Sequence, residues 1–405
     1  MTYSSFLPDY VVRLLADRPR VVPLVQRADG VVLFADIVGF TPMSAALADA
    51  GPEGTEELSE ILNGFFARMI DLVTSYGGAV AKFAGDALTA LFPFESTTRD
   101  TARRAVGCAL DMQAATRGFQ VMTTRAGTFP LAMRAGLGAG RVLAAVVGDP
   151  VIRLEHVLAG EAVDRAVAAE RRAASGQVMA HAALLEDDHG IEVAGESGTP
   201  AMVTRLSGRV RRTPRRPPRI AVTDENGLAA FLHPTIAERI DRGHGGLVDE
   251  HRTVTVVFVG FPDLVDDDPG AVDRLQRYVA AAVRLIDRWG GHLRQVDLGD
   301  KGSVLLVVFG APVRLEDHEE RAVRCCVELL RLPGGPFRAG MTTGRAWCGE
   351  VGSDARREYA IVGDPVNLAA RLMEMAAPGQ ALADRATWEG TCGTAVGSPL
   401  LPITV

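Results

Sequence analysis

The chain contains an internal repeat, and this feature limits its fold more than any other. A succession of motifs returns in the same order about two hundred residues after its first appearance, which is the signature of a duplicated unit. The matched pairs are FLPDYVVRLL and FLHPTIAERI (from Phe6 and Phe231), RAVGC and RAVRC (104–108 and 321–325), RAGLGAGR and RAGMTTGR (134–141 and 338–345), and GEAVD and GDPVN (160–164 and 363–367). We therefore expect two copies of one domain.

The boundary between the copies is a basic, proline-rich segment, SGRVRRTPRRPPR, at 207–219. It has no apolar periodicity and cannot build a core, which is typical of a linker. We place the first domain at 1–206, the linker at 207–228 and the second domain at 229–405. The linker's charges are interpreted as a solvated run, with electrostatic contact to a partner as the alternative.

Apolar spacing in both halves predicts a succession of strands and helices. In the first half we expect a strand at 31–37, a helix over 58–73 ending at Gly77-Gly78, a hairpin of 79–84 and 87–92, a helix at about 100–116 and a strand pair around 134–147. The matching helix of the second half, at about 272–286, ends at Gly290-Gly291.

Two aspartates lie in segments otherwise apolar enough to be buried. Asp36 is in LFADIVGFT and Asp86 is in AKFAGDALTALF, each beside a glycine at the end of a predicted strand. Taken singly, each could be a turn or N-cap residue. Together they form the hard-oxygen pair that Mg²⁺ prefers.

The two copies differ in complementary ways. Gly260 stands opposite Asp36 and, counting from Lys82 and Lys301, Leu305 stands opposite Asp86, so we expect only the first copy to hold cations. The second copy has Asn367 and Arg371 four apart on one helix face, where the first has Asp164 and Ala168. Homologous domains on one chain usually pack as a pseudo-twofold pair, so the sequence predicts one complete site across the interface and one vestigial site.

These motifs resemble the class III nucleotidyl cyclases. The resemblance rests on FADIVGFT, KFAGDAL, DKG before an apolar strand, and REYAIVGDPVNLAARL, and the tandem arrangement resembles the soluble, bicarbonate-responsive adenylyl cyclases. It implies two ferredoxin-like α+β domains packed as a pseudo-twofold heterodimer. It also implies conversion of ATP to 3′,5′-cyclic AMP and pyrophosphate by two-metal catalysis at one composite site. The alternative is a catalytically weak or inactive nucleotide-binding module of a larger signalling protein.

The resemblance assigns roles to individual residues. Asp36, Asp86 and the backbone carbonyl of Ile37 would hold two Mg²⁺ ions, which Mn²⁺ could replace. Arg371 would stabilise charge on the transferring phosphoryl group and Asn367 would hold the ribose.

Recognition of the base is less complete. Lys301 resembles the lysine that contacts the adenine ring, although a strand-end lysine that reaches solvent is the structural alternative. The base-reading position seven before Asn367 is Ala360, whose side chain can form no hydrogen bond, so ATP selectivity is expected to be weaker or to rest on Lys301 and backbone groups. Guanine preference is not expected, because the acidic residue of guanylyl cyclases is absent at the lysine position.

The vestigial site is expected to keep a cation, Lys82, without a pair of aspartates opposite it. By resemblance, we carry over bicarbonate binding to Lys82 as a hypothesis. The related enzymes have an arginine near the end of the motif that contains Val163 and Asp164. In this chain Val167 falls at about that place, although Arg165 is close by.

Composition excludes several other classes of protein. The net charge of −7 is spread along the chain, which argues against nucleic-acid binding. Five cysteines without CxxC spacing indicate neither a disulfide framework nor a zinc site and fit the cytoplasm. The longest uncharged apolar run, 302–313, is shorter than the roughly 20 residues of a membrane span. The end of the chain, LLPITV, resembles an unfinished strand, so we expect a truncated chain that continues, as in the relatives, into an ATPase module and helical repeats.

Overall fold

The computed structural model contains two large sheets, one in each half of the chain, and a small two-stranded sheet in the first half. It describes residues 2–16, 22–94, 98–186, 190–195, 200–215, 225–243, 249–262, 268, 270–299, 302–391, 393 and 397–398. We call 1–206 the first half and 229–405 the second half. The expected C-terminal strand and Cys392 lie outside the described residues, as does Lys301.

The first half begins with two short helices that precede its sheet, η1 (Tyr3–Phe6) and α1 (Asp9–Ala16). Its central elements are β1 (Leu24–Val38), α2 (Phe40–Asp49), α3 (Pro52–Ser75), β2 (Ala79–Ala84), β3 (Ala87–Pro93), α4 (Thr98–Thr116) and β6 (Ala132–Asp149). The others are η2 (Arg117–Phe119), β4 (Met122–Thr124), β5 (Gly127–Phe129), β7 (Arg153–Ala159), α5 (Glu161–Glu170), β8 (Val178–Ala180), α6 (Ala182–Leu185), β9 (Ile191–Ala194) and β10 (Ala201–Leu206).

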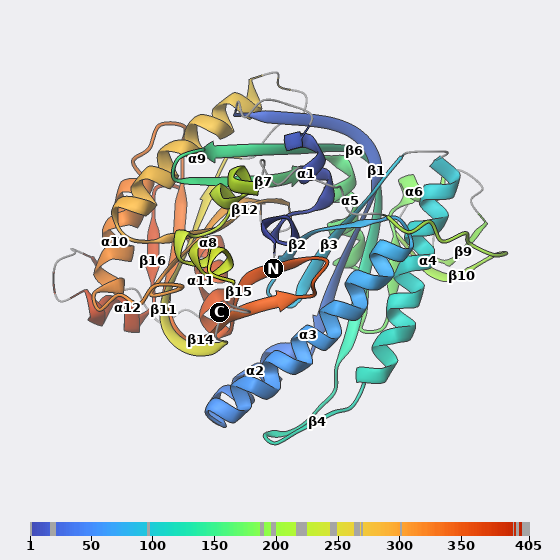
Figure 1. The fold of residues 1–405 in the computed structure, drawn as a ribbon, viewed down its shortest axis with the longest axis horizontal. Coiled ribbons are helices and arrows are strands. Elements are labelled where there is room, and N and C mark those ends of the chain that lie inside the picture. Colours follow the sequence, from blue (N-terminus) through green and yellow to red (C-terminus); the bar gives the residue numbers. More distant parts are fainter. Residues whose placement is uncertain are drawn as a thin grey trace.

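The second half repeats this order. The short helix α7 (Glu225–Leu228) ends the linker. The described elements of the second half are η4 (Ala229–Phe231), α8 (Pro234–Asp241), β11 (Glu250–Phe261), α9 (Ala271–Arg288), β12 (His292–Gly299), β13 (Gly302–Phe309), α10 (His318–Leu329), β14 (Arg338–Gly352), β15 (Arg357–Val362), α11 (Asp364–Met375), β16 (Ala381–Ala383) and α12 (Arg385–Gly390). Figure 1 shows the two halves side by side.

The strand order is the same in both sheets. The first runs β2-β3-β1-β6 and the second β12-β13-β11-β14, which is the ferredoxin-like order. The central strands also share one register: Asp36 lies opposite Ala87 and Arg134, and Gly260 lies opposite Val304 and Arg338. The predicted α+β fold and the repeat are therefore confirmed, and Gly260 does occupy the place of Asp36.

One sequence prediction about this sheet is wrong. The segment around 134–147 is not a strand pair but part of a single strand, β6, whose 18 residues pair with β1 over most of their length and then with β7. The small residues of RAGLGAGR resemble a turn. In the sheet they let α5 pack closely, because a side chain at Gly136 would lie 2.1 Å from the carbonyl oxygen of Ala166.

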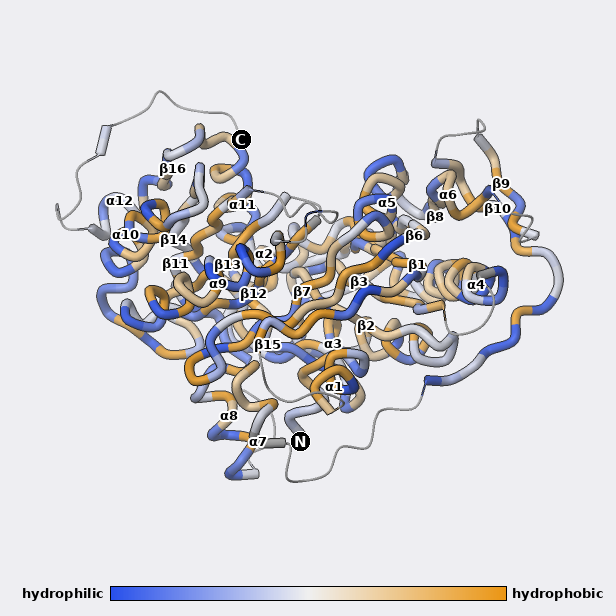
Figure 2. Tube along the Cα trace, turned by 90° about the horizontal axis from the view of Figure 1, so that it is seen from above, coloured by the Kyte–Doolittle hydropathy of each residue, from blue (hydrophilic) through white to orange (hydrophobic). Residues whose placement is uncertain are grey.

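The strands that extend beyond each sheet complete the core of the opposite half. The far end of β6 packs against α9, and β7 packs against β12, so that Leu143, Val147 and Val157 belong to the second half's core. Reciprocally, Trp347 of β14 and Val362 of β15 belong to the first half's core beside α3. In Figure 2 the apolar (orange) stretches of β7 and β15 accordingly lie in the middle of the molecule. Neither half has a complete core alone.

A matched pair of carboxamides holds these exchanged strands. Gln276 of α9 donates to the carbonyl of Gly148 (2.8 Å) and accepts from its amide (2.9 Å). In the other direction, Asn63 of α3 accepts from the amide of Gly352 (3.0 Å). Both glycines have positive φ, 118° and 125°. Because each carboxamide lies 14 residues before the glycine that ends its helix, the two anchors are equivalent in the repeat.

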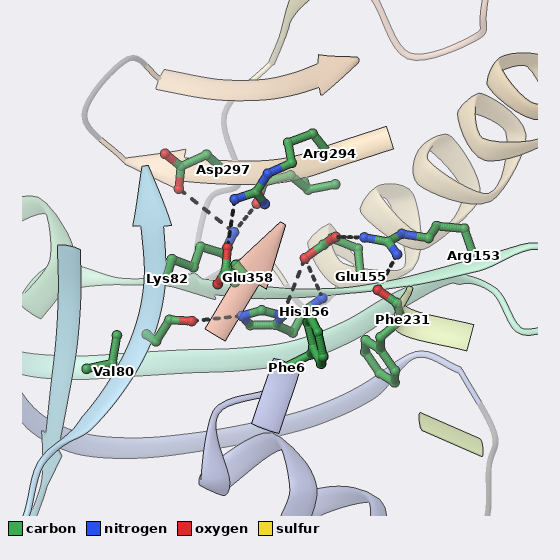
Figure 3. A network of polar contacts seen from close by, with 12 residues as sticks. Phe6, Val80, Lys82, Arg153, Glu155, His156, Phe231, Arg294, Asp297 and Glu358 are labelled. Carbon is green, nitrogen blue, oxygen red and sulfur yellow. Dashed lines mark hydrogen bonds and ion pairs between the residues drawn. The ribbon is translucent and has the colours of Figure 1, made fainter. Parts of the chain in front are cut away.

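A second matched contact ties the N-terminal segment of each half to the other half. Arg356, at the start of β15, donates to the carbonyl of Phe6 (3.0 Å), and Arg153, at the start of β7, donates to that of Phe231. Figure 3 shows the Arg153 contact. The FLP and FLH motifs of the repeat thus supply backbone acceptors for arginines across the interface.

Charged and histidine side chains are buried where these contacts meet. Arg294 donates to Glu358 (2.9 Å), which is also paired with Arg356, while Arg153 is paired with Glu155 (3.3 Å) (Figure 3). Although burial acts in the opposite direction, Arg356 and Arg294 lower the pKa of Glu358; burial raises that of Glu155. A cavity of about 40 Å³ lies among these groups, which is room for ordered water.

The described part of the linker contacts the first half. Arg212 is paired with Asp111 (2.5 Å) and stacks over Tyr76, and Arg215 is paired with Asp9. The expected solvated run therefore fits most of 207–215, which is exposed, but not Arg215, whose side chain is 12% exposed. Residues 216–224 lie outside the description.

None of the helices in the described part of the chain is both long enough and apolar enough to cross a membrane. The 24 residues of α3, for example, carry several glutamates.

The exchange of strands predicts a large effect at Trp347. This side chain is fully buried in the other half's core and its Nε1 donates to Ser59 Oγ (3.0 Å). Trp347→Ala should lower the free energy of unfolding by about 3–5 kcal/mol. Chemical denaturation measures this, with Trp388→Ala, whose side chain is 43% exposed, as the control. Equal effects of the two changes would contradict the exchanged-core interpretation.

The buried histidines predict acid sensitivity. Burial, with Lys82 and Arg356, lowers the pKa of His156 to about 3, while its Nε2 contacts the carbonyl of Ala81 (3.0 Å). The unfolded chain takes up this proton near pH 6.5, so stability from neutral His156 is present above that pH and is lost as pH falls toward 3. At pH 5 the loss is about 2 kcal/mol relative to pH 8.

Urea unfolding at both pH values measures this loss. His156→Gln keeps an amide donor but cannot titrate in this range, so its stability should fall less between pH 8 and pH 5. The same acid loss in both proteins would show that His156 does not contribute.

Candidate active site

A cavity of about 340 Å³ lies between the two halves and has walls from both. Asp36 and Asp86 of the first half line it together with Asn367 and Arg371 of the second. These are the four residues that the sequence analysis assigned to one composite site. The packing of the two halves brings the aspartates together with Asn367 and Arg371, which lie 281 to 335 residues further along the chain.

Asp36 is held near the end of β1 by local geometry. Gly39, three residues on, has φ +90°, and a side chain there would lie 2.2 Å from the carbonyl oxygen of Pro130. The chain therefore turns sharply into α2 directly after the aspartate. The Asp36 side chain is 19% exposed, and its Oδ2 accepts from Arg134 Nη2 (2.8 Å) and Nε (3.0 Å).

Arg134 was quoted in the repeat but not predicted as a site residue. It lies opposite Asp36 on β6, lines the cavity, and is also paired with the buried Glu170 (2.5 Å). Its register position beside a candidate metal ligand was the signal that could have identified it. The pair shows that the Asp36 carboxylate lies where a cation is accommodated.

Asp86 lies in the two-residue turn between β2 and β3, after Gly85 with φ +66°. The positive φ suits a tight hairpin, which turns Asp86 toward the same cavity as Asp36. Ile37 follows Asp36 in β1, and its side chain is buried in the first half's core. Only its backbone carbonyl is thus left to contribute to a metal site.

Asn367 and Arg371 are on the exposed face of α11, one turn apart. The helix starts after Gly363, whose φ is 152°, and has Pro365 in its first turn. On the opposite face, Ala369 and Ala370 are buried against the sheet. The amphipathic pattern of α11 therefore fixes the direction in which both polar side chains point.

Three further polar residues on β12 line the cavity: Arg294, Gln295 and Asp297. The sequence analysis did not identify them, because the repeat was aligned through the two lysines. In the sheet, Lys82 pairs with Thr89 and Gln295 pairs with Leu306, at equivalent places relative to the central strand.

The equivalence of Lys82 with Lys301 is therefore wrong, and so is that of Asp86 with Leu305. Lys82 corresponds to Gln295, and Leu305, which pairs with Val259, corresponds to Leu88, which pairs with Ala35. The error arose because the hairpin of the second half is four residues longer than that of the first.

Ala360 does not line this cavity. It is 2% exposed and packs in the first half's core, while its neighbours Ile361 and Val362 line the cavity. Lys301 lies outside the described residues, so its place relative to the cavity is not described.

The equivalent place in the second half is Gly260, which has no side chain to bind a metal. A side chain there would lie 2.8 Å from Met373 Sδ and 3.2 Å from Arg338 Cγ. Asp164 and Ala168 on α5 correspond to Asn367 and Arg371, as aligned from the sequence. Arg165 donates to the carbonyl of Ala139 (2.8 Å) and is paired with Glu161 (3.3 Å).

Comparisons with known proteins agree with this geometry. Residues 25–193 match the family model described as adenylate and guanylate cyclase catalytic domain. Adenylate cyclase type 10 of Homo sapiens is 26% identical over 96% of this chain, and that of Mus musculus is 27% identical over the same share. The chain spans about a quarter of their length, 26% in each case.

Two other relatives are informative. An uncharacterized protein of Mycobacterium tuberculosis is 36% identical over 35% of this chain and 28% of its own. The crystal structure of a class III adenylyl cyclase-like ATP-binding protein from Pseudomonas aeruginosa has a TM-score of 0.62 at 12% identity, over 90% of this chain and 85% of that one. The last match shows that the fold extends over both halves. Residues 25–193 are thus similar to the adenylate and guanylate cyclase catalytic domain, and the similarity to adenylate cyclase type 10 extends over 96% of the chain.

Proposed function

We propose that the chain is an adenylyl cyclase, which converts ATP to 3′,5′-cyclic AMP and pyrophosphate at one composite site. The observation that carries the proposal is the cavity lined by Asp36 and Asp86 from one half and by Asn367 and Arg371 from the other. A site of this kind needs carboxylates for cations and an arginine for phosphate, and the two halves supply one set each.

The residues present fit a two-metal site. Two carboxylates with substrate phosphates are a common environment for Mg²⁺. No group of three or more metal-ligating His, Cys, Asp or Glu side chains occurs among the described residues, so further oxygen ligands would come from the Ile37 carbonyl and the substrate. Two Mg²⁺ ions, or Mn²⁺ in their place, would stabilise charge on the attacking and leaving oxygens. Asp36 would exchange its contact with Arg134 for one with metal.

The remaining polar residues would orient the substrate. Arg371 has the planar donor set that matches phosphate oxygens, so we assign it to the phosphoryl group that reacts. Asn367, one turn earlier, would hold the ribose. Arg134 is near the metal carboxylate and would be drawn to the triphosphate once released from Asp36.

Selection of the base would depend on the β12 wall rather than on Ala360. Gln295 offers both a donor and an acceptor, which suits the edge of adenine, whereas the Asp297 carboxylate offers only acceptors. Lys301 keeps its proposed role at the adenine ring. Because a carboxylate suits the donors of guanine, GTP is included in the test below.

Location and regulation follow as further parts of the proposal. The four described cysteines are free and buried, which fits a cytoplasmic enzyme. The longer relatives support a role as the catalytic part of a larger regulatory protein. Bicarbonate binding at Lys82 stays a hypothesis, and the contacts of Lys82 and Arg165 within the protein weigh against it.

A nucleotide-binding module without turnover is the second candidate. The similar fold of a protein described as ATP-binding favours it, as does the absence of a polar side chain at Ala360. The intact set of Asp36, Asp86, Asn367 and Arg371 favours the enzyme, because a sensor has no evident use for a residue that stabilises a transition state.

Incubation with each nucleotide separates the two functions. With ATP and Mg²⁺ or Mn²⁺, the purified chain should produce cyclic AMP and pyrophosphate, measured by chromatography, and less cyclic GMP from GTP. No cyclic product under either metal, together with measurable ATP binding, would exclude the enzyme and leave the binding module.

Substitutions test whether the first half supplies the metal ligands and the second half supplies the phosphate-binding arginine. Asp36→Asn and Arg371→Ala should each lower kcat by about a hundredfold or more, because each removes charge stabilisation that acts mainly in the transition state. Asp164→Asn, at the corresponding place in the first half, is the matched control and should retain activity. Comparable losses in all three variants would contradict the assignment of one active and one vestigial site.

A further inference from the structure

Lys82 occupies an unusual position for a lysine. The chain has only two lysines, Lys82 and Lys301, and otherwise relies on arginine for positive charge. The Lys82 side chain is 6% exposed, although buried lysines are rare unless paired. It extends from β2 of the first half toward β12 of the second, as Figure 3 shows.

Its ammonium group has two partners across the interface. It donates to the backbone carbonyl of Val296 and lies 4.0 Å from Asp297 Oδ1. Asp297 lines the active-site cavity and is 37% exposed, so Lys82 contacts the cavity wall from behind. A bond to a backbone carbonyl fixes the strand itself and not only one mobile side chain.

We propose that Lys82 is a positioning residue that sets the spacing between the metal-binding half and the substrate-binding half of the composite site. This inference rests on the proposed function. It assigns to Lys82 a role in the active site that differs from anion binding in the vestigial site.

Lys82 and its partner Val296 are each only a few residues from a residue that lines the active-site cavity. Lys82 is four residues before Asp86, on the strand that leads into the metal-binding turn. Val296 lies between Gln295 and Asp297, both of which line the cavity. A shift of β12 relative to β2 therefore changes the distance between Asp86 and the β12 wall. Catalysis by positioning is sensitive to such shifts, since a 1 Å displacement can cost about a hundredfold in rate.

A lysine suits this place better than the arginines used elsewhere. Its compact charge fits against a carbonyl and a carboxylate, whereas a guanidinium needs several acceptors in one plane. The charge also acts on neighbouring groups, because Lys82 opposes the rise that burial causes in the pKa of Glu155. Removal of Lys82 would leave the Val296 carbonyl without this donor.

The contacts also conflict with a free anion receptor. An ammonium group that already donates to a carbonyl and faces a carboxylate would have to leave both to bind bicarbonate. Lys82 is the counterpart of Gln295 in the first half, but its side chain reaches Asp297, which lines the active-site cavity.

Lysine NMR tests the contact without any need for activity. Protein labelled with ¹³Cε-lysine should give two lysine signals, and Lys82→Met assigns them. Asp297→Asn should shift the Lys82 signal, and bicarbonate at fixed pH should not. A Lys82 signal that moves with bicarbonate but is unchanged by Asp297→Asn would overturn the proposal in favour of anion binding.

Kinetics test the consequence. Lys82→Met should lower kcat by about ten- to a hundredfold with a much smaller change in KM, and any bicarbonate stimulation should keep its wild-type ratio. Lys82→Arg, which keeps a donor, should recover part of the rate. Arg324→Met, which removes an exposed cation from α10, is the control and should behave as wild type. An unchanged kcat with lost bicarbonate response would contradict the proposal.

The two experiments also separate this inference from the proposed function. If the wild-type chain has no cyclase activity, the proposed function fails, while NMR and the affinity for a fluorescent ATP analogue still report on the Lys82 contact. Thermal unfolding of Lys82→Met identifies a folding defect. In that case the Asp297→Asn shift, measured on a protein that keeps Lys82, decides the question.

Discussion

The exchange of strands between the two halves is the constraint on which the rest of the structure depends. Each half lacks part of its core, and the missing part comes from β6–β7 or β14–β15 of the other. Because protein interiors tolerate few voids, this exchange fixes how the halves sit together. The equivalent carboxamides Asn63 and Gln276 then set the registration at each end.

The composite site is a consequence of that packing. An exchange related by a pseudo-twofold axis creates two equivalent clefts, and only one of them has the full set of Asp36, Asp86, Asn367 and Arg371. Asp36 is replaced by Gly260, which has no side chain to bind a cation. The loss of one site has little effect on the structure when the other is complete, because both sites depend on the same core and the same packing of the two halves. Lys82 contacts the wall of the surviving site through Asp297.

Much of the fold and part of the site could be predicted from sequence because they depend on local patterns. Apolar spacing indicated α3 and the β2–β3 hairpin, and the repeat gave the duplication. Asp36 and Arg371 were identifiable because a charged residue within an otherwise apolar segment or a recognisable motif is more often functional than structural. The equivalence of Lys82 with Lys301 was wrong because the hairpin of the second half is four residues longer than that of the first. A match of residue type between the two copies does not reveal this difference in length.

The contacts between halves could not be predicted from sequence. Tertiary register determines three of these features: the single long β6, the burial of Ala360 in the opposite core, and the β12 wall of Gln295 and Asp297. Short sequence motifs carry no information about that register. Arg134 was visible only as part of a repeated motif. Its contact with Asp36 requires the pairing of β1 with β6, which are about a hundred residues apart.

The central claim is that one substrate molecule is held by both halves at once. Anomalous scattering from crystals grown with Mn²⁺ and a non-cyclising ATP analogue tests it most directly. We predict manganese at about 2.0–2.2 Å from carboxylate oxygens of Asp36 and Asp86, with the nucleotide phosphates within hydrogen-bond distance of Arg371. Nucleotide bound in this cavity through one half only, or manganese away from both aspartates, would contradict the account.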